Sequence, residues 1–542
     1  MAKSKVDHLS VWKEFEKGRN FKNQIKLYDT VRDNENFFIG KQWEGVDANG
    51  LPTPVFNFIK RVVLFTVASI SSGNVKMQAV PFFGDSSHGT TRVSNIINAE
   101  FDKLFERNKI VSLFREVVRN AAVDGDGCTY TYWDPDIETG QPSKGAIVTE
   151  LIENTRVYFG NANDRRVQRQ PYIIIEKREM VDEIQDRAKE NGVSDWEAIK
   201  PDTETQSMDN AFQTDDKVTI LLRMWKNKET KTIWAVETTK DFTIREPWDT
   251  GLTLYPITWL NWDYIQDCYH GQAMVTGLIP NQEFVNKAYA MSMMSLMTTA
   301  YPKVVYDRNR VTRWSNAIGA AIPINGGDVN NVAKIIDPAQ ISPQIAQFIK
   351  MAEEDTMASM GATTVALGEG KAYNTSAIVA LQKAAATPHE ITRQNLYQNI
   401  EDLGRIYIDF MAEYYGERLI DVPQEAEEAL EFAEMPAPTF DYNTLKDMHF
   451  TIKLDVGASA YWSEIASVQT LDNLLRLGLI DVVDYLERVP EGYVIKKQEL
   501  IDKLKMQMAQ MPVRPEPQGS GVTPEVDIGE QNLNRIAQQF DA

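Results

Sequence analysis

The chain contains few of the residues that build disulfide frameworks and metal sites. Its 542 residues include two cysteines, Cys128 and Cys268, and five histidines. Two cysteines so far apart cannot supply a disulfide framework or a zinc site, so we expect both to be small buried hydrophobic residues in a reducing compartment. The histidines show no ligand spacing, and the sequence predicts no metal site and no cofactor.

Positive charge is scarce as well. The chain has 57 Lys and Arg residues against 77 Asp and Glu residues, which gives a formal net charge of −20. Proteins that hold nucleic acid tightly are normally basic, because neutralisation of phosphates drives their binding. The composition therefore disfavours tight DNA binding, but it is compatible with DNA that slides past a repelling surface.

No apolar run is long enough to span a bilayer. The longest uncharged stretches, 62–75 and 288–302, are shorter than the roughly 20 apolar residues that a membrane helix needs. The first ten residues, MAKSKVDHLS, lack the apolar core of a signal peptide. We therefore expect a soluble protein without membrane association.

Complete catalytic motifs are also missing. Residues 368–371, GEGK, resemble the end of a phosphate-binding P-loop, but Val365 replaces its first glycine and Ala372 replaces its final Ser or Thr. Residues 389–390 begin like the zinc motif HExxH, but Arg393 stands where the second histidine is required. The sequence predicts no catalytic residue and favours a protein that is not an enzyme.

What the chain does contain is an orderly series of helical and strand-like segments. Before residue 270, the stretches 10–40 and 93–118 have helical character. The polar run 187–216 predicts a surface insertion. Alternating or β-branched runs predict strands at 75–81, 128–133, 145–152, 171–176, 218–225, 232–237 and 256–260, the second and third forming a long-looped hairpin. The first half is therefore expected to be α+β.

The second half begins with two helices around a small β module. The first helix is predicted over 278–299, with Pro280 in its first turn, and short strands follow at 301–306 and 320–324. The second helix is expected to start with Ser342 as N-cap and Pro343 as its first residue, and to end at Gly361.

A third helical region is predicted over 376–415, with a kink at Pro388. Proline removes one helical hydrogen bond and clashes with the preceding turn. After an acidic linker come a strand at 449–456 and helices at 463–477, 481–488 and 495–509. The final residues, 511–542, have the composition of a disordered tail.

In this order of segments the chain resembles the portal proteins, or head-to-tail connectors, of tailed bacteriophages. The resemblance covers about residues 25–510. It rests on four stretches: the aromatic run 36–43 followed by Asn57, the glycine turn and hairpin at 125–135, the helix 271–302 running into a strand, and the helix opening at 374–378.

The resemblance implies a portal-like α+β fold that assembles into rings. Its parts would be a wing (1–270, with a returning strand region 416–460), a first stem helix (271–300), a clip (301–341), a second stem helix (342–361), a tunnel loop (362–375), a kinked tunnel helix (376–415) and a helical crown (461–510).

The implied function is a structural ring, of twelve copies in this family, at the capsid vertex of the virion and assembled in the host cytoplasm. Its channel would serve genome packaging and ejection. The implied partners are further copies of the chain, the terminase, a head-tail adaptor, the major capsid or scaffolding protein, and double-stranded DNA that passes non-specifically. Two alternatives are a packaging enzyme, ATPase or nuclease, and another ring-forming virion adaptor.

The resemblance also assigns site residues. The loop that faces DNA would contain Gly368, Glu369, Gly370, Lys371 and Asn374, and the helix kink would lie at Pro388. The candidates for partner or phosphate contact in the clip are Arg308, Arg310 and Arg313, which otherwise form a solvated cluster. Four methionines at 291, 293, 294 and 297 form either a soft surface for packing against neighbouring subunits or a core stripe.

Overall fold

The computed structural model describes residues 6–48, 50–71, 75–82, 88–202, 216–300, 304–315, 321–326, 328–335, 343–362, 387–420, 439–456, 461–477 and 480–489, with the single positions 497, 500, 501 and 503. The chain divides into two compact units, Met1–Ala460 and Tyr461–Ala542. Helices and sheets are mixed, which confirms the predicted α+β class. None of the described helices is long and apolar enough to cross a membrane.

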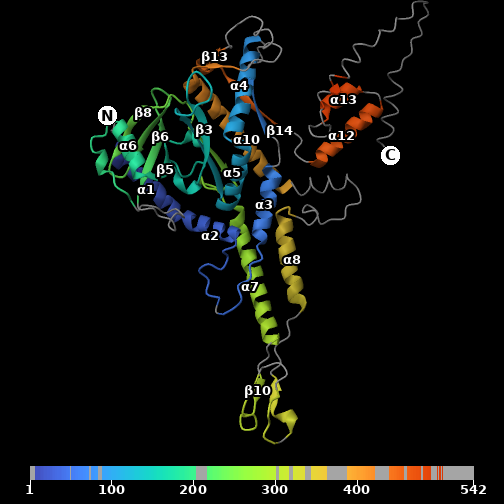
Figure 1. Cartoon of the computed structure of the whole chain (residues 1–542). Coiled ribbons are helices and arrows are strands. Elements are labelled where there is room, and N and C mark those ends of the chain that lie inside the picture. The colour runs from blue at the N-terminus through green and yellow to red at the C-terminus, as the bar shows by residue number, and fades with distance from the viewer. Residues whose placement is uncertain are drawn as a thin grey trace, which may run out of the picture. The chain divides into compact units, whose positions relative to one another are not determined.

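Two antiparallel sheets lie in the first unit (Figure 1). The larger sheet has the strand order β4-β5-β6-β7-β8, and the smaller one has the order β3-β2-β9. The strands are β2 Asp126–Asp134, β3 Ala146–Ile152, β4 Val157–Phe159, β5 Ile173–Met180, β6 Lys217–Lys226, β7 Ile233–Thr238, β8 Thr243–Asp249 and β9 Ile257–Asn261.

The predicted strands are present, and the long-looped hairpin is confirmed as β2 and β3. Cys128 pairs with Ile152 at one end of the hairpin, and Asp134 pairs with Ala146 at the other. The sequence does not predict β4 or β8. β4 has three residues, and β8 contains charged residues and a proline that strand propensities disfavour.

Each of the two helical stretches predicted near the N-terminus consists of two helices. The first contains α1 His8–Gln24 and α2 Leu27–Ile39, and the second contains α4 His88–Arg107 and α5 Ile110–Asp124. Lys26 (φ 56°) and Lys109 (φ 49°) adopt left-handed conformations at the breaks. Such a conformation costs a non-glycine residue about 1–2 kcal/mol. Here it lets successive helices run in different directions.

A strand from each end of the first unit forms a separate pair. β1 Val75–Pro81 runs antiparallel to β14 Phe450–Val456, with Val75 opposite Val456 and Pro81 opposite Phe450. Both strands are predicted from their alternating pattern, and the pairing brings a late segment of the chain back to the early helices. A helix, α3 Phe58–Ser71, precedes β1 and contributes the buried side chains of Ile59, Val62 and Val63 to the main core.

The described part of the surface insertion predicted at 187–216 is mostly exposed, but it is not an irregular loop. Helix α6 Val181–Glu190 packs on β5 and β8, and the short turn Trp196–Ala198 packs on α6. Ala188 and Ile199 are buried in a core cluster with Ile184. The polar composition conceals an amphipathic helix whose apolar residues recur every three or four positions. Residues 203–215 lie outside the described residues.

The two helices expected around a small β module are confirmed. They are α7 Met274–Ala300 and α8 Pro343–Ser359, and they lie side by side (Figure 1). α7 starts four residues earlier than predicted, so Pro280 lies beyond its first turn. Between the two helices, β10 Val304–Tyr306 pairs with β11 Ala333–Ile335. The strand predicted at 320–324 is wrong, because the described residues 321–325 form no strand and β11 takes that place.

The remaining elements complete the first unit and begin the second. The turn η6 Thr387–His389 leads into α10 Glu390–Phe410, which continues as the π-helical turn η7 Met411–Tyr415. Strands β12 Glu417–Leu419 and β13 Thr439–Asp441 then form a small pair, and the helical turn η8 Tyr442–Asp447 leads to β14. In the second unit, α12 Tyr461–Arg476 and α13 Val482–Arg488 confirm two predicted helices. The helix predicted at 495–509 lies almost entirely outside the described residues.

The carboxylate of Asp126, at the start of β2, joins four segments of the first unit. Its side chain is fully buried and accepts hydrogen bonds from Asn261 Nδ2 (2.7 Å), the Gly271 amide (2.7 Å), His270 Nδ1 (2.7 Å) and Asn154 Nδ2 (3.2 Å). Burial lowers the pKa of His270 and so favours the neutral imidazole, whose Nδ1–H donates to Asp126. The carboxylate thus fixes the residues that lead directly into α7.

Two glycines allow this close approach. Gly125 has φ +99°, and a Cβ there would lie 2.6 Å from the Gly271 carbonyl oxygen. A Cβ on Gly271 would lie 2.9 Å from the Gly125 carbonyl oxygen. The two backbone segments therefore meet only because neither residue has a side chain.

Lys22 of α1 is buried beside this centre. Its Nζ donates to the carbonyl oxygens of Asn154 (2.8 Å) and Thr155 (2.9 Å), and it lies 3.8 Å from the centroid of the Tyr158 ring. Burial lowers the pKa of Lys22 to about 7. α1 is thereby connected to the same segment, around residue 154, that donates to Asp126.

We expect Asp126→Ala to lower the free energy of unfolding by about 3–5 kcal/mol, because it leaves four buried donors without their acceptor. Urea unfolding followed by tryptophan fluorescence measures this change. Amide hydrogen exchange should also accelerate at residues 270–275, where α7 begins.

The matched control is Asp136→Ala in the exposed hairpin loop, which should change the free energy of unfolding by less than about 0.5 kcal/mol. Equal urea midpoints for the two variants would contradict a central role for Asp126.

Candidate functional site

Helix α7 has a buried first half and an exposed end. Its 27 residues span about 40 Å at 1.5 Å per residue. Val275, Leu278 and Val285 are buried in the main core. Toward the end of the helix, Met291 is 60% exposed and Leu296 is 68% exposed. α7 is therefore held by the first unit at its start and presents apolar side chains to solvent near its end.

Two amides hold α7 to the start of α3. Gln282 is fully buried, and its Oε1 accepts from the backbone amides of Phe58 (3.1 Å) and Ile59 (3.4 Å). Its Nε2 donates to the Phe56 carbonyl oxygen (2.8 Å) and to Asn286 Oδ1 (3.0 Å). The first amides of a helix have no partner within that helix, and a side chain of α7 satisfies two of them here.

The hydrogen bonds of Gln282 and Asn286, which we call the amide ladder, continue to the aromatic stretch 36–43. Asn286 Nδ2 donates to Gln42 Oε1 (2.6 Å), and Gln42 Nε2 donates to the Phe37 carbonyl oxygen (3.1 Å). Sequence reasoning misses this ladder. The sequence feature that could have predicted it is a pair of amide side chains at i and i+4, Gln282 and Asn286, within a mainly apolar helix.

α8 packs on α7 through a few specific contacts. Phe284 and Phe348 meet edge to face, with ring centroids 5.7 Å apart, and Asn281 Nδ2 donates to Thr356 Oγ1 (3.1 Å). Tyr289 forms a side-chain hydrogen bond with Glu353, whose pKa is raised because burial disfavours the charged carboxylate. These contacts fix α8 alongside the part of α7 nearest the core.

An extended set of apolar side chains remains exposed on the two helices. We call it the α7–α8 apolar surface. Its members are each between 41% and 68% exposed: Phe284, Met291, Met293, Leu296, Met297, Ile345, Phe348 and Met351. Single exposed apolar residues are ordinary, but a set this large on one helical pair is typical of an interaction surface. From the sequence, the four methionines could form either a core stripe or a surface for neighbouring subunits. Three of them are exposed, which favours packing against neighbouring subunits.

The three candidate arginines lie together beyond β10. Arg308, Arg310 and Arg313 are all exposed. Arg310 Nε lies 3.5 Å from Asp307 Oδ2, and no carboxylate in the described part of the chain forms a salt bridge with Arg308 or Arg313. Nearby, the rings of Tyr306 and Trp314 stack with centroids 5.2 Å apart. Whether these arginines contact a partner stays a prediction.

The predicted DNA-facing loop cannot be compared with the structure. Gly368, Glu369, Gly370, Lys371 and Asn374 lie outside the described residues. Pro388 belongs to η6, directly before α10, but residues 376–386 are also outside, so the kink stays a prediction. Among the residues that the structure describes, no group of three or more His, Cys, Asp or Glu side chains is placed to hold a metal ion.

We expect Gln282→Leu to lower the free energy of unfolding by about 1–3 kcal/mol, because the Ile59 amide loses its acceptor and the Phe58 amide and Phe56 carbonyl keep only their hydrogen bond to each other. Hydrogen exchange at residues 58–61 should accelerate selectively.

Glu283→Gln is the control on the exposed side of the same helix turn. It removes an i,i+4 pair with Lys287 that is worth about 0.2–0.5 kcal/mol. Unchanged exchange at 58–61 in Gln282→Leu would show that α7 is not anchored through this amide.

Comparison with known protein families identifies one region of the chain. Residues 245–478 match the family model of the phage P22-like portal protein. The match runs from β8 through α7, the β10–β11 pair, α8, α10 and β14 into α12. No curated protein matches the chain. The match confirms the resemblance predicted from the sequence and supports a phage portal protein, a family that is structural and not enzymatic.

Proposed function

We propose that this chain, which carries a P22-like portal region at 245–478, is the ring-forming connector at a capsid vertex of a tailed phage. DNA would be packaged and ejected through the channel of the ring. The observation that carries the proposal is the α7–α8 apolar surface, which lies inside the matched region and has no covering element among the described residues.

The apolar surface supports assembly through its size and chemistry. Burying one large apolar side chain contributes about 1.5–3 kcal/mol, so even partial burial of eight such side chains favours association of neighbouring helical pairs. Methionine adapts its shape to a partner, which suits contacts that must form between many identical copies. Contacts of this head-to-tail kind close into a ring when the rotation between copies permits.

We take the parts of the ring from the portal proteins that the chain resembles. Residues 1–270, with the returning region 416–460, would form the wing. Residues 271–300, which include α7, and residues 342–361, which include α8, would form the stem. Residues 301–341 would be the clip, where Arg308, Arg310 and Arg313 would contact the terminase and later a head-tail adaptor. Arg308 and Arg313, which form no salt bridge within the described residues, suit acidic surfaces on such proteins.

The channel would be lined further along the chain. Residues 362–375 would form the tunnel loop, 376–415 the kinked tunnel helix and 461–510 the crown. At −20 per chain, the assembled ring would repel phosphate, so DNA would pass without being retained. Lys371 would make transient contacts only. We place the assembled ring in the virion and its assembly in the host cytoplasm.

A packaging ATPase or nuclease is the weaker alternative. The portal match covers the segment that contains the P-loop-like residues 368–371, and Val365 and Ala372 remove two positions that a P-loop needs. A tail adaptor is weaker for the same reason, because the matched family is that of portal proteins.

We expect the double variant Met291→Asp/Leu296→Asp to remain folded but to lose ring assembly, since two charges would be buried at each subunit contact. Sedimentation velocity should then give the mass of the single chain, 61.5 kDa, under conditions where the wild type sediments as a large assembly.

The double variant Met291→Leu/Leu296→Met keeps both side chains apolar and should assemble like the wild type. Circular dichroism and the urea midpoint check that both variants fold, as expected for exposed positions. Normal assembly of the aspartate variant would contradict the proposed role of this surface.

A further inference from the structure

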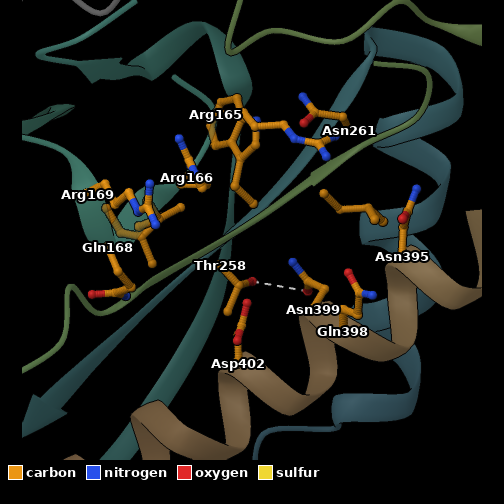
Figure 2. Close-up of a pocket in the computed structure, with 14 residues that line it drawn as sticks. Arg165, Arg166, Gln168, Arg169, Thr258, Asn261, Asn395, Gln398, Asn399 and Asp402 are labelled. Carbon is orange, nitrogen blue, oxygen red and sulfur yellow. Dashed lines mark hydrogen bonds between the residues drawn. The ribbon is translucent and has the colours of Figure 1, made fainter. Parts of the chain in front are cut away.

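A polar cavity of about 390 Å³ lies in the first unit, away from the α7–α8 apolar surface. Its walls come from the loop around η2 Val167–Arg169, from β9 and from α10. Figure 2 shows arginines on one side of this cavity and the amides of α10 on the other. Its volume falls in the usual range of ligand pockets, about 300–1,000 Å³.

The arginine wall consists of Arg165, Arg166 and Arg169, all exposed. Arg166 pairs with Asp164, at 2.9 Å from Nε to Oδ1, and this pairing lowers the pKa of Asp164. Arg165 lies over the Tyr264 ring at 4.5 Å. Within the described ranges, Arg165 and Arg169 have no carboxylate partner in a salt bridge. Two guanidinium groups are therefore available on a chain whose net charge is strongly negative.

The opposite wall is one face of α10. Asn395, Gln398, Asn399 and Asp402 recur at the spacing that places helical residues side by side. Asn399 is only 4% exposed, and its Oδ1 accepts from Thr258 Oγ1 (3.1 Å). That bond turns its Nδ2 toward the cavity (Figure 2), where no described residue accepts from it. The Asn399 amide therefore offers a hydrogen-bond donor to a ligand in the cavity.

The arginine loop is held in place by its own amides. Gln168 Nε2 donates to the Tyr255 carbonyl oxygen (3.0 Å), and its Oε1 accepts from the Tyr255 amide (2.9 Å). Gln170 Oε1 accepts from the Asn161 amide (2.9 Å), and Tyr255 Oη donates to the Gln170 carbonyl oxygen (3.0 Å). The loop is thus ordered before any ligand arrives, which reduces the entropy lost on binding.

We propose that this cavity binds an extended, carboxylate-bearing peptide segment of a partner protein. A guanidinium presents parallel N–H donors that match a carboxylate. The side-chain amides of Asn395, Gln398 and Asn399 each offer a donor and an acceptor, as a peptide bond does. Their spacing along α10 provides several such pairs in a row. This inference does not depend on ring assembly.

Nucleic acid fits the cavity less well. Nucleic-acid sites normally form broad basic surfaces and not a single concave pocket. Arg165 and Arg169 at the open side of the cavity provide a local attraction for one or two carboxylates of a peptide. The amide wall then supplies contacts along the peptide backbone.

The test measures binding of a dye-labelled (Glu-Ala)₄ peptide to the full chain by fluorescence anisotropy at low salt. We expect binding, weaker at high salt, and at least about tenfold weaker for Arg169→Gln and for Asn399→Asp, since each loses a contact with a charged group. Arg169 is exposed, so Arg169→Gln keeps the test valid if the buried Asn399→Asp variant is poorly folded.

The controls separate the classes of ligand. Arg32→Gln, which changes an exposed arginine on α2, should bind the peptide like the wild type, and (Gln-Ala)₄ should not bind. The proposal is overturned if (Glu-Ala)₄ does not bind the wild type, or if its binding is unaffected by Arg169→Gln. Stronger competition by inorganic phosphate or by an oligothymidylate than by unlabelled (Glu-Ala)₄ would also overturn it and assign the cavity to phosphate.

Discussion

The buried carboxylate of Asp126 holds together the segments from which α7 emerges. It accepts from Asn154, Asn261, His270 and the Gly271 amide, and the absence of side chains at Gly125 and Gly271 lets these segments meet. A buried charge without these donors would cost several kcal/mol, so the arrangement is stable only when complete. The direction in which α7 leaves the main core is therefore set by polar contacts, and apolar packing alone would not specify it.

A second set of polar contacts holds α7 further along its length. Gln282 satisfies the first amides of α3, and Asn286 continues the ladder to Gln42. Beyond Ala290, which is still buried, α7 exposes Met291, Met293, Leu296 and Met297 of the α7–α8 apolar surface. Rigid anchoring at one end and exposed apolar side chains at the other suit a helix that packs against copies of itself. This combination connects the fold of one chain to the proposed ring.

The sequence predicts best what depends on local chemistry. The start of α8 at Pro343 and the alternation in β1 and β14 are visible in short stretches of residues. The breaks at Lys26 and Lys109 are not, because no glycine or proline marks them and lysine gives no sign of a left-handed conformation. Gln282 and Asn399 escape prediction for another reason. Each gains its role from partners far away in the sequence. The sequence alone does not distinguish a buried Asn or Gln side chain from an exposed one.

The central claim is that the α7–α8 apolar surface joins neighbouring subunits of a ring. Electron cryo-microscopy of the purified full chain tests this most directly. The account predicts closed rings with a central opening, in which Met291 and Leu296 of each subunit are buried against the helical pair of the next. Single chains under all assembly conditions, or rings in which this surface faces solvent, would contradict it.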